Sequence, residues 1–291
     1  MNTGLNSYKK TIFSQWGEDG IIEEIFKRIG ETNRLCVEFG AGDGFECSNV
    51  WHLIKDRGWN ALLMEPDEAR YEKWMALKKE APRLEVLKTA VAPEGDASLE
   101  SILERNGAPR SLDLLSIDID GDDYHIFKDM KAFKPRVLII EHNPTIPPED
   151  SIVQAYGEKE PFGASARANL DLAHEKGYSL AAMTHTNCIF VRSDEFAKLG
   201  IEEPGLEEVF DRSGLSYVVS AYNGSLYLRG LRGKGQPAFG WIYRGFRVSF
   251  FWSRIHAFAF GLAFKAKISA TLARRYGAIV AFYSGKRHTQ P

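Results

Sequence analysis

Short apolar runs alternate with amphipathic stretches over the first two thirds of the chain, and this pattern predicts alternating strands and helices. Residues 19–29 predict a helix, because four isoleucines and Phe26 fall on one helical face and Gly30 can end it. The same reasoning predicts helices at 48–55, 67–79, 98–107, 124–130 and 165–176. Strands are expected at 35–39, 61–64, within 84–91, and at 112–119, 137–140, 178–183 and 188–192.

The order of these elements predicts an α/β fold. Strands separated by helices pair in parallel, so most of the sheet is expected to be parallel. The short connection at 184–187 instead predicts an antiparallel pair at the end of the sheet. The proline-rich stretch 143–163 interrupts the alternation, and we expect it to form a loop, or lid, over the strand ends.

The composition is that of a globular protein, with 44% hydrophobic and 26% charged residues in 291. That length accommodates one large α/β domain and an appendage. Three cysteines, Cys36, Cys47 and Cys188, form no even disulfide framework, which favours a reducing, cytoplasmic setting. The first ten residues lack the apolar core of a secretory signal, which agrees with a cytoplasmic location.

Charge is distributed unevenly along the chain. Residues 231–291 contain eleven lysines and arginines and no acid, which leaves 26 basic residues against 39 acids in the preceding part. An acidic body followed by a basic segment predicts two parts with different roles. We therefore predict a catalytic domain at 1–230 and a separate basic, aromatic C-terminal tail at 231–291.

The tail has the composition of a membrane-surface segment. Residues 239–264 interleave ten aromatic side chains with arginines, which is typical of a helix lying in an anionic lipid interface. Arg254 and His256 interrupt the apolar run, so a spanning helix is not expected. Two alternatives are a helical lid or oligomer interface against the acidic body, and a nucleic-acid site, which the acidic body disfavours. The leading hypothesis is that residues 236–291 bind the inner face of a membrane peripherally.

A glycine-rich turn follows the first strand, where residues 35–44 read Leu-Cys-Val-Glu-Phe-Gly-Ala-Gly-Asp-Gly. Glycines at alternate positions let a backbone approach a ligand closely, and α/β sheets bind nucleotides at this edge. The glycine spacing departs from Gly-x-Gly-x-x-Gly, which disfavours a pyrophosphate. Glu65, at the end of the second strand, suits a ribose with free hydroxyls. These features favour a nucleoside cofactor at the turn.

Several acids follow the fourth strand in the segment Ser116-Ile-Asp118-Ile-Asp120-Gly-Asp-Asp. Alternation along a strand predicts that Ser116, Asp118 and Asp120 share one side. Two buried carboxylates repel each other unless a cation is near, and a sulfonium, an amino group or a divalent metal could serve. Asp122 is expected to cap the next helix.

Glu141 and His142 end the fifth strand, which we expect to pair with the fourth. Asp120 and Glu141 would then meet at the sheet edge and could hold Mg²⁺ or Mn²⁺. His142 could instead act as the general base that takes a proton from an acceptor hydroxyl. The alternative is that His142 only hydrogen-bonds the following turn.

Taken together, these motifs resemble the FkbM-type methyltransferases, a group of class I S-adenosylmethionine-dependent enzymes. The resemblance covers residues 12–192, and the Asp-x-Asp-Gly pattern after the fourth strand is its most specific part. Family members commonly have Glu-Gly where this chain has Asp120-Gly121. The motifs that carry the resemblance are Ser14-Gln15-Trp16-Gly17-Glu18-Asp19, Glu38-Phe39-Gly40, Ile117-Asp118-Ile119-Asp120-Gly121, Glu141, Gly177-Tyr178 and Asn187-Cys188-Ile189-Phe190-Val191.

The resemblance implies a Rossmann-like methyltransferase sandwich, with a mostly parallel seven-stranded sheet and an antiparallel last strand. The basic, aromatic C-terminal extension lies outside the family core, and we expect it to be helical. The resemblance also implies S-adenosylmethionine as cofactor, bound by Gln15, Glu38, Gly40, Gly42, Asp43, Glu65, Ala90 and Asp118. The expected catalytic residues are Asp118, Asp120 and His142. The expected metal ligands are Asp120 and Glu141.

The family is associated with O-methylation, often of sugars, so the expected acceptor is a hydroxyl of a sugar or glycan built at a membrane. A nicotinamide-dependent oxidoreductase is the alternative enzyme, and the absence of Tyr-x-x-x-Lys after the fourth strand counts against it. A non-catalytic scaffold for glycan assembly is the other alternative. The clustering of acids at strand ends counts against a scaffold, which has no use for them.

Overall fold

The computed structural model describes residues 4–40 and 47–215 with their side chains, and the backbone of short strands at 217–220, 226–229, 232–233 and 236–237. The chain divides into two compact units, one of residues 1–144 and 148–211 and the other of residues 145–147 and 212–291. The predicted domain boundary at residue 230 stays a prediction. The aromatic segment 239–264 lies outside the described residues.

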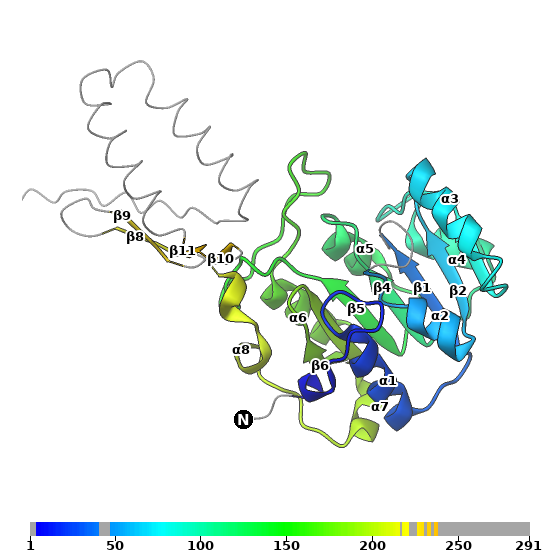
Figure 1. Cartoon of the computed structure of the whole chain (residues 1–291), viewed down its shortest axis with the longest axis horizontal. Helices are drawn as coiled ribbons and strands as arrows, with labels where there is room; N and C mark the ends of the chain where they lie inside the picture. Colours follow the sequence, from blue (N-terminus) through cyan, green and yellow to red (C-terminus); the bar gives the residue numbers. More distant parts are fainter. Residues whose placement is uncertain are drawn as a thin grey trace, which may run out of the picture. The chain divides into compact units, whose positions relative to one another are not determined.

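The first unit is built on a seven-stranded sheet with the order β3-β2-β1-β4-β5-β7-β6 (Figure 1). β7 is antiparallel to both of its neighbours, and the pairs among β1 to β5 are all parallel. This arrangement confirms the predicted Rossmann-like sheet with an antiparallel last strand. The strands are β1 Leu35–Phe39, β2 Asn60–Met64, β3 Leu84–Leu87, β4 Leu114–Ile117, β5 Val137–Glu141, β6 Tyr178–Met183 and β7 Asn187–Arg192.

Three of the helices between the strands begin where the sequence supplies a capping side chain. Asp67, Ser98 and Ser165 each accept a backbone hydrogen bond from the first turn of the following helix, as N-cap residues do. The helices of this unit are α1 Glu18–Ile29, α2 Trp51–Arg57, α3 Glu68–Leu77, α4 Leu99–Arg105, α5 Asp123–Asp129, α6 Ala166–Glu175, α7 Ser193–Phe196 and α8 Leu206–Val209, with 3₁₀ turns η1 Asn6–Tyr8 and η2 Ala197–Leu199.

Most strand residues are buried on both faces of the sheet, as expected for a sheet covered by helices on each side. One large core cluster joins α1, α2 and α3 to one sheet face, with Trp51 and Trp74 in edge-to-face contact at 5.5 Å. Arg136 is buried at the other end of β5, where it pairs with Asp113 at 2.8 Å and Glu195 at 2.9 Å. These ion pairs lie at the amino end of β5, whereas the candidate site lies at the carboxyl ends of the strands.

β4 ends earlier than the apolar pattern predicts. Asp120 has a φ of +59°, which strand residues do not adopt. The buried Asp123 carboxylate accepts hydrogen bonds from the N–H groups of Ile119 (2.8 Å) and Gly121 (2.9 Å). These contacts form a tight turn, so the prediction that strand alternation continues to Asp120 is wrong.

The second unit contains two described strand pairs. β8 Tyr217–Ser220 pairs antiparallel with β9 Leu226–Arg229, and β10 Arg232–Gly233 pairs with β11 Gln236–Pro237. A 3₁₀ turn, η3 Arg212–Gly214, precedes them. Within the described part of the chain, no helix has the length and apolarity needed to cross a membrane.

Candidate active site at the carboxyl edge of the sheet

Four predicted acids lie at or just beyond the carboxyl ends of neighbouring parallel strands. Glu38 is in β1, Glu65 follows β2, Asp118 follows β4 and Glu141 ends β5. The sheet order places these four strands side by side, as the sequence predicts. The predicted cofactor residues Gly42 and Asp43 fall within 41–46, outside the described residues.

Gly40 begins the glycine-rich turn in a conformation that excludes a side chain. Its φ is +83°, and a Cβ at this position would lie 1.3 Å from the carbonyl oxygen of Asp118. The backbone after β1 therefore passes directly against the backbone after β4. Close packing between the ends of β1 and β4 therefore explains why the first residue of the turn is glycine.

Glu38 binds residues that follow the glycine-rich turn in sequence. Its carboxylate accepts hydrogen bonds from Ser48 Oγ (2.6 Å) and from the Asn49 N–H (2.8 Å). Burial raises the pKa of Glu38 to about 7 against the lowering effect of these donors. Asn49 Nδ2 also donates to Ser116 Oγ at 3.1 Å, which ties the turn to β4. A direct contact of Glu38 with the cofactor stays a prediction.

Glu65 presents a buried carboxylate oxygen without a hydrogen-bond partner among the described residues. Its Oε1 accepts a hydrogen bond from the Asp67 N–H at 2.8 Å, which orients the carboxylate. Its Oε2 is buried and has no hydrogen-bond partner among the described residues. A buried oxygen without a donor is costly, so this side chain fits a ligand that donates hydroxyl protons, such as a ribose diol.

The segment before α1 lies against the end of the glycine-rich turn. The Phe13 carbonyl accepts a hydrogen bond from the Cys47 N–H at 3.0 Å. Asp19 Oδ2 holds this segment by accepting three backbone N–H bonds of 2.8 Å from residues 12–14. Gln15 is exposed beside these anchored residues, and Ala90 is exposed after β3. The roles of Gln15 and Ala90 toward the cofactor stay predictions.

Asp118, Asp120 and Glu141 form one acidic cluster, in which the carboxylate oxygens lie within 4.8 Å of one another. Burial, together with Asp123 and Asp120, raises the pKa of Asp118 to about 8. Burial and the Asp118 charge raise the pKa of Glu141 to about 10. Asp118 and Glu141 therefore favour the protonated form at neutral pH unless a cation approaches. Three clustered carboxylates supply the oxygen ligands that Mg²⁺ or Mn²⁺ prefers.

His142 lies apart from this cluster. Its side chain is 2% exposed, and its ring centroid is 5.7 Å from that of Phe210, the residue that follows α8. Burial lowers the pKa of His142 to about 4, and neither ring nitrogen has a hydrogen-bond partner among the described residues. Its role as general base stays a prediction.

Two side-chain contacts in this unit were missed from the sequence. Asp122 was expected to cap α5, but it makes no capping bond and instead accepts hydrogen bonds from Gln154 Nε2 (3.0 Å) and the Gly157 N–H (3.1 Å). Glu18 is fully buried and accepts from Asn187 Nδ2 at 3.0 Å. The acid-rich motifs drew attention to these residues, but their contacts could not be predicted because the partners are distant in sequence.

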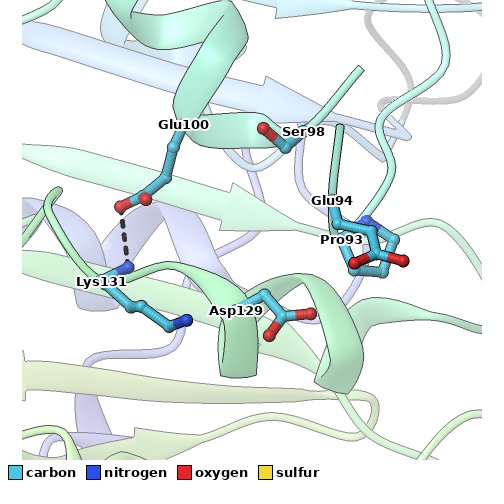
Figure 2. A pocket seen from close by; sticks show the side chains of 6 residues that line it. All are labelled: Pro93, Glu94, Ser98, Glu100, Asp129 and Lys131. Atoms are coloured by element: carbon cyan, nitrogen blue, oxygen red, sulfur yellow. Dashed lines mark hydrogen bonds between the residues drawn. The ribbon is translucent and has the colours of Figure 1, made fainter. Parts of the chain in front are cut away.

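A separate pocket of about 200 Å³ contains none of the predicted site residues. Figure 2 shows the Glu100 carboxylate on its wall accepting a hydrogen bond from the Lys131 N–H at 2.7 Å. The same oxygen also accepts from the Phe133 N–H at 3.2 Å, so this acid has its partners within the chain. The pocket is lined by Pro93, Glu94, Ser98, Glu100, Asp129 and Lys131.

The strand order β3-β2-β1-β4-β5-β7-β6, with β7 antiparallel, is the Rossmann-like topology expected of a class I methyltransferase. Residues 93–180 match the model of the methyltransferase FkbM domain. The predicted resemblance to FkbM-type, S-adenosylmethionine-dependent methyltransferases is thereby confirmed over these residues, which include Asp118, Asp120 and Glu141. No curated protein sequence matches the chain significantly.

Solved methyltransferases resemble the chain only distantly. The N-terminal domain of EvdMO1, with SAH bound, is 12% identical and has a TM-score of 0.38, with 60% of this chain and 79% of that one covered. Magnesium protoporphyrin IX methyltransferase from Synechocystis PCC 6803, with bound SAM, is 11% identical with a TM-score of 0.39, covering 60% and 78%. A SAM-dependent methyltransferase from Aquifex aeolicus is 12% identical with a TM-score of 0.35, covering 58% and 87%.

Proposed function

We propose that this protein transfers the methyl group of S-adenosylmethionine to a hydroxyl of a sugar or glycan. The match to the FkbM domain supports methyl transfer, and the association of FkbM-type enzymes with sugar O-methylation supports the acceptor class. The observation that carries the proposal is the pairing of two different sites at one sheet edge. Glu65 has a buried, unpartnered oxygen that would suit the ribose, and the acidic cluster would lie at the acceptor end of the cofactor.

In this proposal the cofactor supplies an electrophilic methyl group, and the chain orients the acceptor and takes its proton. The hydroxyl becomes a stronger nucleophile as its proton passes to a carboxylate of the cluster. Asp118 and Glu141 suit this step. Burial raises the pKa of both carboxylates, and a positive charge nearby lowers it again, so that they ionise and can take the proton. Alignment of oxygen, methyl carbon and sulfur then contributes much of the rate.

A divalent cation is a further part of the proposal. Asp118, Asp120 and Glu141 would hold Mg²⁺ or Mn²⁺, which would lower the pKa of a bound acceptor hydroxyl. The sequence-based prediction named Asp120 and Glu141, and the geometry adds Asp118 to the set. Titration of Mn²⁺ followed by its paramagnetic resonance signal tests this part, with Glu141→Gln as the variant expected to lose binding.

Methyl transfer can be tested with radiolabelled S-adenosylmethionine and a panel of methyl glycosides. We expect label in at least one glycoside with the parent protein, and a loss of about 100-fold or more with Asp118→Asn. Exposed Glu104→Gln is the matched control and retains activity. Binding of S-adenosylhomocysteine without transfer to any hydroxyl compound would contradict the acceptor class and leave the cofactor site standing.

The basic tail and the location of the protein complete the proposal. We propose that the protein is cytoplasmic and that residues 236–291 hold it to the inner face of an anionic membrane, where a glycan acceptor is assembled. The composition of this segment supports the proposal. Deletion of residues 236–291 is expected to abolish sedimentation with phosphatidylglycerol vesicles. Unchanged sedimentation would refute the membrane role without affecting methyl transfer.

A further inference from the structure

Gln154 is a buried side chain that clamps a surface loop to the turn after β4. It is 3% exposed, and its Nε2 donates to Asp122 Oδ1 at 3.0 Å. Its Oε1 accepts from the N–H groups of Phe162 (2.8 Å) and Gly163 (2.7 Å), which closes the loop on itself. The Gln154 amide therefore hydrogen-bonds through both its nitrogen and its oxygen, and it joins the loop at 155–163 to the acidic turn.

The clamped loop lies directly on the turn that carries the acidic cluster. The Gly157 N–H donates to Asp122 Oδ1 at 3.1 Å. A Cβ on Gly121 would lie 3.0 Å from the Cβ of Pro161, so the loop and the turn are in close contact. Gly121 is the residue after Asp120, and the loop therefore borders the acidic cluster. It belongs to the connection between β5 and α6, which is green in Figure 1.

The loop carries the two most exposed large hydrophobic side chains among the described residues. Tyr156 is 57% exposed and Phe162 is 43% exposed. The His125 ring of α5 lies 5.8 Å from the Tyr156 ring, so the aromatic surface continues onto the helix that follows the acidic turn. Exposed aromatic rings held on a fixed loop beside reactive carboxylates indicate a ligand-binding surface.

We propose that Tyr156 and Phe162 bind the acceptor by stacking on the C–H face of a sugar ring, and that Gln154 is the positioning residue for both. An aromatic ring offers an apolar face to the C–H groups of a sugar, while the neighbouring carboxylates accept hydrogen bonds from its hydroxyls. This inference rests on the proposed methylation of a sugar, and it names the part of the chain that selects the acceptor.

Saturation-transfer NMR tests the inference without turnover. The probes are methyl β-D-glucopyranoside and methyl β-D-galactopyranoside, each added to the full chain with S-adenosylhomocysteine. We expect transfer to the ring protons of at least one probe, with affinity weakened about fivefold or more in Tyr156→Ala and Phe162→Ala. Tyr156→Phe retains the ring and retains binding. Tyr8→Ala, an exposed tyrosine 41% accessible in η1, is the matched control.

Gln154→Ala separates positioning from a general loss of fold. We expect a glycoside affinity as weak as in Tyr156→Ala, while calorimetry finds S-adenosylhomocysteine bound with unchanged affinity. Gln154→Asn, too short to span the same partners, is expected to give the same result. Glycoside binding that survives in both alanine variants of the rings would overturn the inference and leave the methyltransferase proposal intact. Binding of S-adenosylhomocysteine with no binding of either glycoside would overturn the inference together with the sugar acceptor, and failure to bind S-adenosylhomocysteine would overturn the proposed cofactor.

Discussion

Replacing Glu141 by glutamine removes one member of the acidic cluster while keeping its shape. The pKa of Glu141 is raised from 4.5 to about 10 by burial and by the charge of Asp118. The folded protein therefore keeps a proton that the unfolded chain releases above its own pKa. By linkage, this group stabilises the fold fully at low pH, and the contribution is lost as pH rises toward the folded pKa.

The size of the effect follows from the pH interval. A proton retained only in the folded state costs 1.36 kcal/mol per pH unit, which limits the loss between pH 5.5 and 8 to about 3 kcal/mol for one group. Asp120 is exposed to solvent, which screens part of the repulsion. We therefore expect the free energy of unfolding of the parent protein to fall by about 1.5 kcal/mol more than that of Glu141→Gln over this interval.

The measurement is urea denaturation at pH 5.5 and pH 8 in metal-free buffer. Glu100→Gln is the control, because three backbone N–H donors outweigh burial and lower the pKa of Glu100. Its loss should reduce stability equally at both pH values. Equal changes with pH in the parent protein and in Glu141→Gln would refute the reasoning, since the cluster would then carry no retained proton.

Three further predictions concern single residues. Glu65→Ala should weaken S-adenosylhomocysteine binding by about 10- to 100-fold in calorimetry, because a charged hydrogen bond is lost, whereas the exposed Glu68→Ala should not; equal affinities would contradict this role. Gly40→Ala should lower the free energy of unfolding by roughly 3 kcal/mol or more through its clash, against about 1 kcal/mol for Gly200→Ala, whose left-handed φ is +63° with open space around it; similar losses would contradict the packing argument. Arg136→Met should cost about 3 to 5 kcal/mol in urea denaturation, because two buried carboxylates lose their partner; a neutral result would show that they remain solvated.

Much of the fold could be predicted because each element carries its own local signal. Period-two and period-3.6 patterns located the strands and helices of the sheet, and capping residues such as Asp67 and Ser98 marked helix starts. The end of β4 could not be found this way. Ile119 continues the apolar alternation, and only the bonds made by Asp123 show that the backbone turns there.

The candidate site was predictable where strand order alone brings residues together. Asp120 and Glu141 follow neighbouring strands, so their proximity followed from topology. The burial of His142 beside Phe210 was not predictable, because α8 lies 60 or more positions further along the chain. The same limit hid the Asp122–Gln154 bond, which joins two loops whose contact no local pattern encodes.

The central claim is that the carboxyl edge of the sheet binds a sulfonium nucleoside next to the acidic cluster. A crystal structure of the protein with S-adenosylhomocysteine and Mn²⁺ tests it most directly. We predict the ribose diol on Glu65, with the sulfur facing Asp118 and Glu141. A nucleoside bound elsewhere, or a ribose that leaves Glu65 Oε2 without a partner, would contradict the claim.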